Sequence, residues 1–215
     1  MSGPTRLVAA AVVAVALAAG AAAIAFSGHG AAASAAETVT QAVAIARDAL
    51  PATARDVHGK PGGELLSVDL QGDGSAQVML YDYATGLTHQ VTVDSGKASA
   101  DQSAPRMQPP ASSDETDAAF AIALRAPHPL RFTTTFAQQQ GVPLVSADQA
   151  KVDAEAWRAG DTSAGGAGAR HAASISATHR CLQLVVATAA GEYLDTSDFV
   201  VDLTAGRVLR LQEGS

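Results

Sequence analysis

The pattern of apolar and polar positions predicts a first unit made of one helix and several short strands. Residues 37–50 place valine, alanine and leucine on one helical stripe, and Pro51 ends the helix. Ser95-Gly96 can start a short return strand after three segments of strand character. The three segments are 64–70, 76–83 and 87–94, and turns that contain glycine separate them. Strands joined by such short turns pair as antiparallel neighbours.

A second unit follows, with two helical patterns and then four strands. The helical patterns cover about 114–125 and 130–140, and Gly141 ends the second of them. Residues 160–174 are rich in glycine, alanine and serine, which predicts a flexible loop between the first two strands. The strand-like segments are 151–157, 179–188, 198–203 and 207–211.

The organisation of the chain is that of a repeated α+β module. Residues 101–113 are rich in proline and serine and lack an apolar period, so we interpret them as an interdomain linker. QVMLYDYATG with VTVDSGKAS in the first unit is similar to QLVVATAAGEY with VVDLTAGRVL in the second. A helix that covers one face of an antiparallel sheet satisfies both apolar surfaces. We therefore expect two tandem α+β modules, at 37–100 and 114–215.

The first 36 residues have the pattern of an export signal. Arg6 and the amino terminus supply the positive charge, Leu7 to Phe26 form an uncharged apolar run, and small residues at 33–36 offer a cleavage site. We expect the protein to be secreted or otherwise extracytoplasmic. A retained membrane anchor is the alternative, because about 20 apolar residues span a bilayer. The high alanine content of the run favours cleavage.

Composition narrows the partners and the covalent chemistry. The chain is 47% hydrophobic but only 4% aromatic, so its cores must consist mostly of small aliphatic side chains. Removal of residues 1–36 would take away one charge, Arg6, and change the formal net charge from −7 to −8. Nucleic acid is therefore disfavoured as a partner. Cys181 is the single cysteine, so an internal disulfide cannot form.

The stretch MLYDYATG holds two of the three tyrosines and is the most conspicuous candidate for catalysis. Strand alternation puts Met79, Tyr81 and Tyr83 on one face. Val78 and Leu80 lie on the other face. We interpret the stretch as a core strand that leads into a turn.

Candidate metal ligands occur in the second unit. His179 and Cys181 are two residues apart on a predicted strand, so they share a face and form a possible copper or zinc pair. We favour an exposed histidine beside a packed thiol, because no third ligand is nearby in sequence. Three acidic residues lack a basic or nucleophilic partner in a recognisable spacing: Asp148, Asp153 and Glu155. We predict no catalytic residue.

Several motifs resemble the amino-terminal domains of copper-containing amine oxidases. GVPLVSADQAKVDAEAWRAG at 141–160, HRCLQLVV at 179–186 and FVVDLTAGRVLRLQE at 199–213 resemble the third such domain. LPATARDV at 50–57, VMLYDYATGLTHQVTVD at 78–94 and the Gln108-Pro109-Pro110 linker are similar to the second. The resemblance implies two cystatin-like, non-catalytic domains, and we expect the catalytic domain to be absent from this chain.

The resemblance also implies what a catalytic member requires. In that family, three histidines hold copper, two of them in a His-x-His pair, and the quinone forms from the tyrosine of Asn-Tyr-Asp/Glu. Here the six histidines stand singly, Leu80 precedes Tyr81, and the sequence contains no asparagine. We therefore expect a non-catalytic protein without copper or quinone. It would bind a small ligand or a protein, such as a separate amine oxidase domain or another exported protein. The alternatives are a secreted cystatin-like inhibitor or peptide-binding module, and a copper- and quinone-binding amine oxidase.

Overall fold

The computed structural model describes residues 29–105, 107–158 and 166–211. Most of the expected signal segment, 1–36, lies outside these residues, and its last eight residues belong to the first helix, α1 (His29–Ala49). The apolar run from Leu7 to Phe26 is therefore not described. Within the described residues, none of the helices combines the length and the apolar character needed to span a bilayer.

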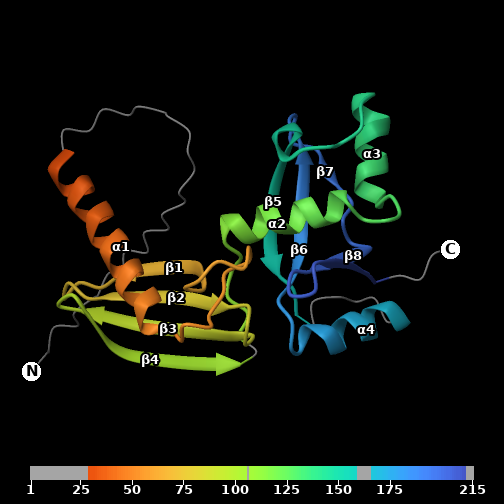
Figure 1. Ribbon diagram of the computed structural model, residues 1–215. Helices are drawn as coiled ribbons and strands as arrows, with labels where there is room; N and C mark the ends of the chain where they lie inside the picture. Colours follow the sequence, from red (N-terminus) through yellow and green to blue (C-terminus); the bar gives the residue numbers. More distant parts are fainter. Residues whose placement is uncertain (1–28, 106, 159–165, 212–215) are drawn as a thin grey trace, which may run out of the picture.

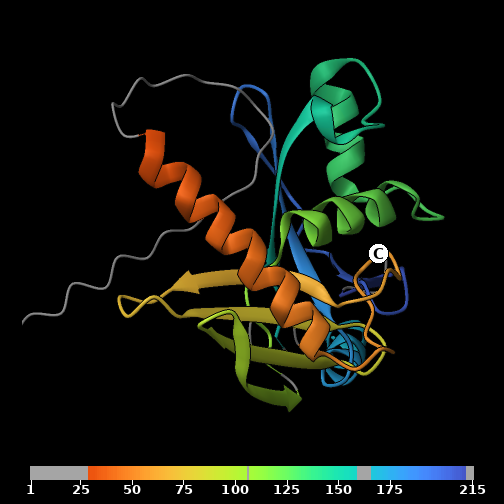
Figure 2. The same cartoon turned by 60° about the vertical axis from the view of Figure 1, so that its left-hand side comes forward.

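The first module is a four-stranded antiparallel sheet with α1 across one face (Figure 1; Figure 2). Consecutive strands are neighbours in the order β1-β2-β3-β4. The strands are β1 (Glu64–Leu70), β2 (Ala76–Asp82), β3 (Leu87–Asp94) and β4 (Lys97–Pro105). The last strand is nine residues long and continues five residues into the segment that the sequence assigned to the linker, 101–113.

The core of the first module follows from the alternation along β2. Val78 and Leu80 point towards α1, and Val78 lies opposite Val91 of β3. They pack against Ala46 and Leu50 on the apolar stripe of α1. The other face of β2 carries Tyr81, so the expected alternation of this strand is confirmed. Small side chains on the helix let it lie close to the sheet, as the low aromatic content requires.

The second module has a five-stranded antiparallel sheet with helices on both faces. β7 pairs only with β6, and the remaining strands have the order β5-β6-β8-β9. The helices are α2 (Ser113–Leu124), α3 (Arg131–Gln140) and α4 (Ala167–Ser176), with a 3₁₀ turn η1 at Ala147–Gln149. The strands are β5 (Ala150–Ala156), β6 (Cys181–Thr188), β7 (Tyr193–Leu194), β8 (Phe199–Asp202) and β9 (Arg207–Arg210). The predicted α+β class is confirmed in both modules.

Two separate cores sandwich the second sheet. On the face covered by α2 and α3, Phe120 and Phe132 pack against Leu182 of β6. On the face covered by α4, Trp157 and Cys181 form a smaller core with residues of α4 and of the strands β8 and β9. β6 therefore supplies side chains to both cores.

The prediction of a loop at 160–174 is wrong in its second half, because the residues from Ala167 onward form α4. Residues 159–165 lie outside the described part of the chain. Ala169 and Ala172 are buried one turn apart against the sheet, so the segment has a packed helical face. A Cβ on Gly168 would lie 2.5 Å from the carbonyl oxygen of Arg210. Glycine here permits close contact between a helix and a strand, and composition alone suggested a flexible chain.

Candidate functional site at the joint between the modules

The joint between the modules is organised around a buried ion pair. Arg180 immediately precedes β6, and Glu115 lies in the first turn of α2. Both side chains are fully buried. Arg180 Nε donates to Glu115 Oε1 at 2.9 Å, and Nη2 donates to Oε2 at 2.7 Å. This two-bond geometry is the strongest form of an arginine–carboxylate pair.

The remaining donors of Arg180 bind the connection between the modules. Nη1 donates to the side-chain oxygen of Gln108 at 3.2 Å and to the carbonyl of Pro109 at 2.8 Å. Nη2 donates to the carbonyl of Pro110 at 3.1 Å. A guanidinium has five N–H groups, and all five are used here. The Gln-Pro-Pro segment is therefore held by hydrogen bonds to the second module.

The two tyrosines of MLYDYATG lie in this joint. The Tyr83 hydroxyl donates to Glu115 Oε1 at 2.6 Å, and Arg180 Cζ lies 5.6 Å from the centre of the Tyr81 ring. Burial raises the pKa of Tyr81 to about 12. Burial and the neighbouring Glu115 carboxylate raise the pKa of Tyr83 well above its usual value. Both phenols therefore stay protonated near neutral pH.

A second carboxylate, Glu64, connects the first residue of β1 to the start of α2. The Ser112 hydroxyl donates to Glu64 Oε1 at 2.7 Å and accepts from the Glu115 backbone N–H at 2.9 Å. Glu115 completes a capping box by accepting from the Ser112 N–H. Glu64 also accepts from the Val57 N–H at 3.3 Å. Burial raises the pKa of Glu64.

Two similar turns lie beside the joint, one in each module. Asp82 accepts from the Ala84 N–H at 2.9 Å, and Asp202 accepts from the Ala205 N–H at 3.0 Å. Both aspartates are fully buried, and each turn ends on a glycine with positive φ, 70° at Gly86 and 63° at Gly206. YDYATG is therefore similar to VDLTAG as a local turn. The sheet orders β1-β2-β3-β4 and β5-β6-β8-β9 place β2 at the position of β6, in agreement with the expected pairing of QVMLYDYATG with QLVVATAAG.

The structure brings the candidate metal pair close to Asp202. His179 Nδ1 lies 3.0 and 2.9 Å from the two carboxylate oxygens of Asp202, and Cys181 pairs with Asp202 across the sheet. Burial raises the pKa of the Cys181 thiol to about 12. Across the described residues, three potential His, Cys, Asp or Glu ligands do not gather at any metal site. His179 and Asp202 form a polar pair beside a packed thiol.

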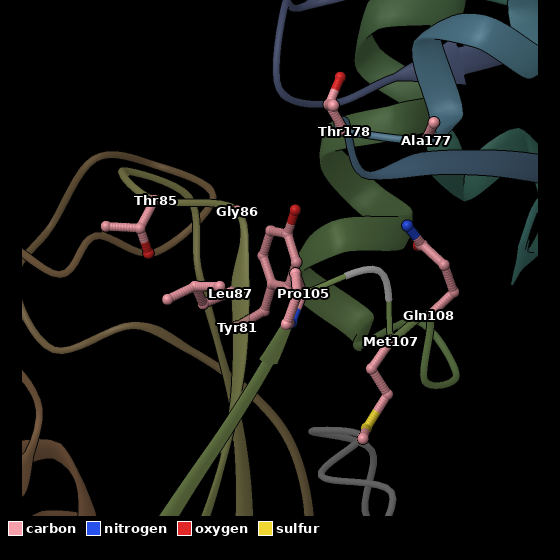
Figure 3. A pocket seen from close by; sticks show the side chains of 9 residues that line it. All are labelled: Tyr81, Thr85, Gly86, Leu87, Pro105, Met107, Gln108, Ala177 and Thr178. Carbon is pink, nitrogen blue, oxygen red and sulfur yellow. The ribbon is translucent and has the colours of Figure 1, made fainter.

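A cavity of about 250 Å³ opens between the modules next to Tyr81 (Figure 3). Its nine lining residues are all uncharged, and they come from the β2–β3 turn, the linker and the end of α4. Several polar groups in the lining already have partners: Gln108 Nε2 donates to the His179 carbonyl, and the Thr85 hydroxyl donates to Asp82. The cavity suits a small uncharged group.

A wider hollow of about 400 Å³ lies along α2, between the loop around His58 and the turn at Gly206. Its lining includes the apolar Ile122 and Leu203 and two exposed charged residues, Asp117 and Arg125. Apolar groups of a partner would fit the apolar part of this lining, and its two charges of opposite sign would not select an ionic ligand of one sign.

Comparison with known proteins leaves the site to be interpreted from its own geometry. No protein-family model matches the chain, and no curated protein matches it.

Sequence reasoning missed Glu64, Glu115 and Arg180 as the centre of the joint. The Ser-x-x-Glu pattern at Ser112 was a detectable signal, because it predicts a capping box and so a partly ordered glutamate. Arg180 gave no such signal, since 65 residues separate it from Glu115. The packing of α2 beside the start of β6 within the second module brings the pair together.

Proposed function

We propose that the protein is an exported, non-catalytic binding module that resembles the amino-terminal domain pair of copper amine oxidases. It would act through contact with a protein partner, such as a separate amine oxidase domain, or with a small ligand. The observation that carries this proposal is the joint. Its buried polar groups on Tyr83, Glu115 and Arg180 bind one another, and the bond from Tyr83 to Glu115 links the two modules.

A fixed arrangement of two modules supports a role in binding. A partner that contacts both modules gains affinity when their relative orientation is already set, because less conformational freedom is lost on binding. The sheets also end in strands with one hydrogen-bonded neighbour each, β4 in the first module and β5 in the second. Such edges can accept an extended segment of a partner.

The experiment combines an activity assay with a binding assay. We expect the purified protein to contain no stoichiometric copper, to give no redox-cycling quinone stain and to release no hydrogen peroxide from primary amines. A separately produced amine oxidase catalytic domain from the same organism should co-elute with it in gel filtration. Stoichiometric copper together with a positive quinone stain would establish the oxidase alternative and refute the proposal.

A matched pair of variants tests whether the joint matters for binding. Tyr83→Phe removes one hydrogen bond of the joint, and Tyr193→Phe removes a hydroxyl that is 79% exposed. We expect the first variant to weaken the complex more than the second, with both variants folded by circular dichroism. Equal affinities would show that the partner does not depend on the joint.

Peptide binding is the second candidate, and the exposed edge of β4 favours it. β4 pairs with β3 along one edge only, and its described side chains are mostly exposed and small, so an extended peptide has access to the backbone of its other edge. A cystatin-like inhibitor would slow a papain-like protease. We expect no such inhibition, because the sequence has no Gln-x-Val-x-Gly segment. Tight inhibition would favour this candidate over the first.

A further inference from the structure

The buried joint contains more negative than positive charge. Glu64 is 3% exposed and Glu115 is fully buried, and the described part of the chain supplies one cation to this group, Arg180. Both strong bonds of the guanidinium to carboxylate oxygens go to Glu115. The hydrogen bonds to Glu64 come from neutral donors, the Ser112 hydroxyl and the Val57 N–H. Ionised Glu64 is therefore a buried charge without its own counter-ion.

The nearby carboxylates repel the charge of ionised Glu64, and the side-chain hydrogen bonds of the charged residues in the preceding loop go to backbone groups. Glu115 and Asp114 of α2 both raise the pKa of Glu64 electrostatically, although burial is the larger cause. In the loop before β1, the Arg55 guanidinium donates to the carbonyls of Ala52 and Ala54. In the same loop, the Asp56 carboxylate accepts from the N–H groups of His58 and Lys60.

Glu64 is also placed where its charge acts on the contact between the modules. It begins β1 in the first module, and its partner Ser112 is the N-cap of α2 in the second. Burial of an unpaired carboxylate is costly, and uptake of a proton removes most of that cost. We propose that the joint is a proton-linked latch in which Glu64 takes up a proton from solvent when the modules dock. Acidification then tightens the joint, and a rise in pH loosens it.

Linkage between protonation and docking determines in which direction pH changes the stability of the docked state. The pKa of Glu64 is higher in the docked protein than in the open or unfolded chain, so the docked state binds more protons. The stabilisation is fully present below the pKa of the unfolded chain. It is lost as the pH rises through the higher pKa of the docked state.

The test uses Glu64→Gln, which keeps the shape of the side chain and mimics the neutral form. Hydrogen exchange of the full chain would be followed by mass spectrometry from about pH 5 to about pH 8, in peptides that contain Val57 and Ser112. At each pH the ratio of wild-type to variant exchange removes the intrinsic pH dependence. We expect this ratio to rise with pH, by up to about tenfold per pH unit where one proton is released.

The matched control is Glu192→Gln, which makes the same chemical change at an exposed position in the β6–β7 turn. This variant should follow the wild type at every pH. A ratio for Glu64→Gln that stays constant with pH would overturn the latch. If the variant does not fold, carboxyl-carbon NMR titration of the wild type decides the question. A Glu64 that titrates with an ordinary glutamate pKa would also overturn it.

Discussion

At the scale of single residues, Arg180 shows what a buried charge requires. Moving a guanidinium and a carboxylate out of water costs several kcal/mol for each ion, and only good geometry with further hydrogen bonds offsets this. Arg180 meets both conditions through Glu115 and the carbonyls of Pro109 and Pro110. The residue therefore fixes two elements and the linker at once.

Replacement of Arg180 should be strongly destabilising. Arg180→Met leaves Glu115 buried without a counter-ion, and we expect the free energy of unfolding in urea to fall by about 3–5 kcal/mol. Arg131→Met is the control, because Arg131 also pairs with a carboxylate, that of Asp195 at 2.6 Å, but both side chains are half exposed. It should change the stability little. Equal losses in the two variants would mean that burial of the Arg180 pair is unimportant.

Cys181 should be unreactive in the folded protein. The thiol is fully buried and its pKa is raised to about 12, so at pH 8 roughly one molecule in ten thousand carries a thiolate. We expect Ellman's reagent to modify Cys181 slowly in native protein and rapidly in concentrated urea. Fast modification under native conditions would show that the core beneath α4 opens readily.

At the scale of elements, the sequence predicted α2 as a helix but predicted a loop where α4 lies, because only α2 carries a local helix signal. α2 begins with a capping box between Ser112 and Glu115, a local signal that the sequence displays directly. α4 is rich in glycine and alanine and lacks a side-chain cap at Gly166. Its stability comes from burial of Ala172 against the second sheet, which no local pattern reveals.

The glycine in α4 provides a test of this account. Gly168→Ala improves helix propensity by about 1 kcal/mol. Its Cβ, however, would clash with the backbone carbonyls of Arg210, the last residue of β9, and of Leu211, which follows it. We expect a net loss of thermal stability, with a lower melting temperature. Gly72→Ala is the control, because a Cβ there meets nothing within 4 Å. A more stable Gly168→Ala variant would contradict the close packing of α4 on β9.

At the scale of the whole molecule, we expect the joint to make the two small modules unfold together. Each module alone has a limited core, because the chain is only 4% aromatic. The hydrogen bonds of Ser112 to Glu64 and of Tyr83 to Glu115 cross between them. Damage to the first core should therefore be felt in the second.

Trp157, the single tryptophan, reports on this coupling from the second module. Leu80→Ala opens a cavity in the first core, where Leu80 is fully buried, and should cost about 2–5 kcal/mol. We expect the urea midpoint of Trp157 fluorescence to fall with that of circular dichroism. Leu70→Ala, at a leucine 40% exposed in the same module, should leave both midpoints nearly unchanged. An unshifted Trp157 transition in Leu80→Ala would show that the modules unfold independently.

The sequence by itself determined the α+β class and the positions of most helices and strands. Apolar periodicity is a local property, so Val78 and Leu80 could be assigned to one face of β2 before their partners were known. Turn chemistry at Gly86 and the capping box at Ser112 are local in the same way. These features depend on residues within a few positions of one another.

Only the tertiary structure decided the helical state of 167–176 and the centre of the joint. Arg180 meets Glu115 across 65 positions, and Tyr83 meets Glu115 across 32. Folding brings these distant residues together, and charged groups that lose contact with water must then bind one another. The charge imbalance at Glu64 is likewise a consequence of docking, since the sequence alone does not show that this glutamate is buried.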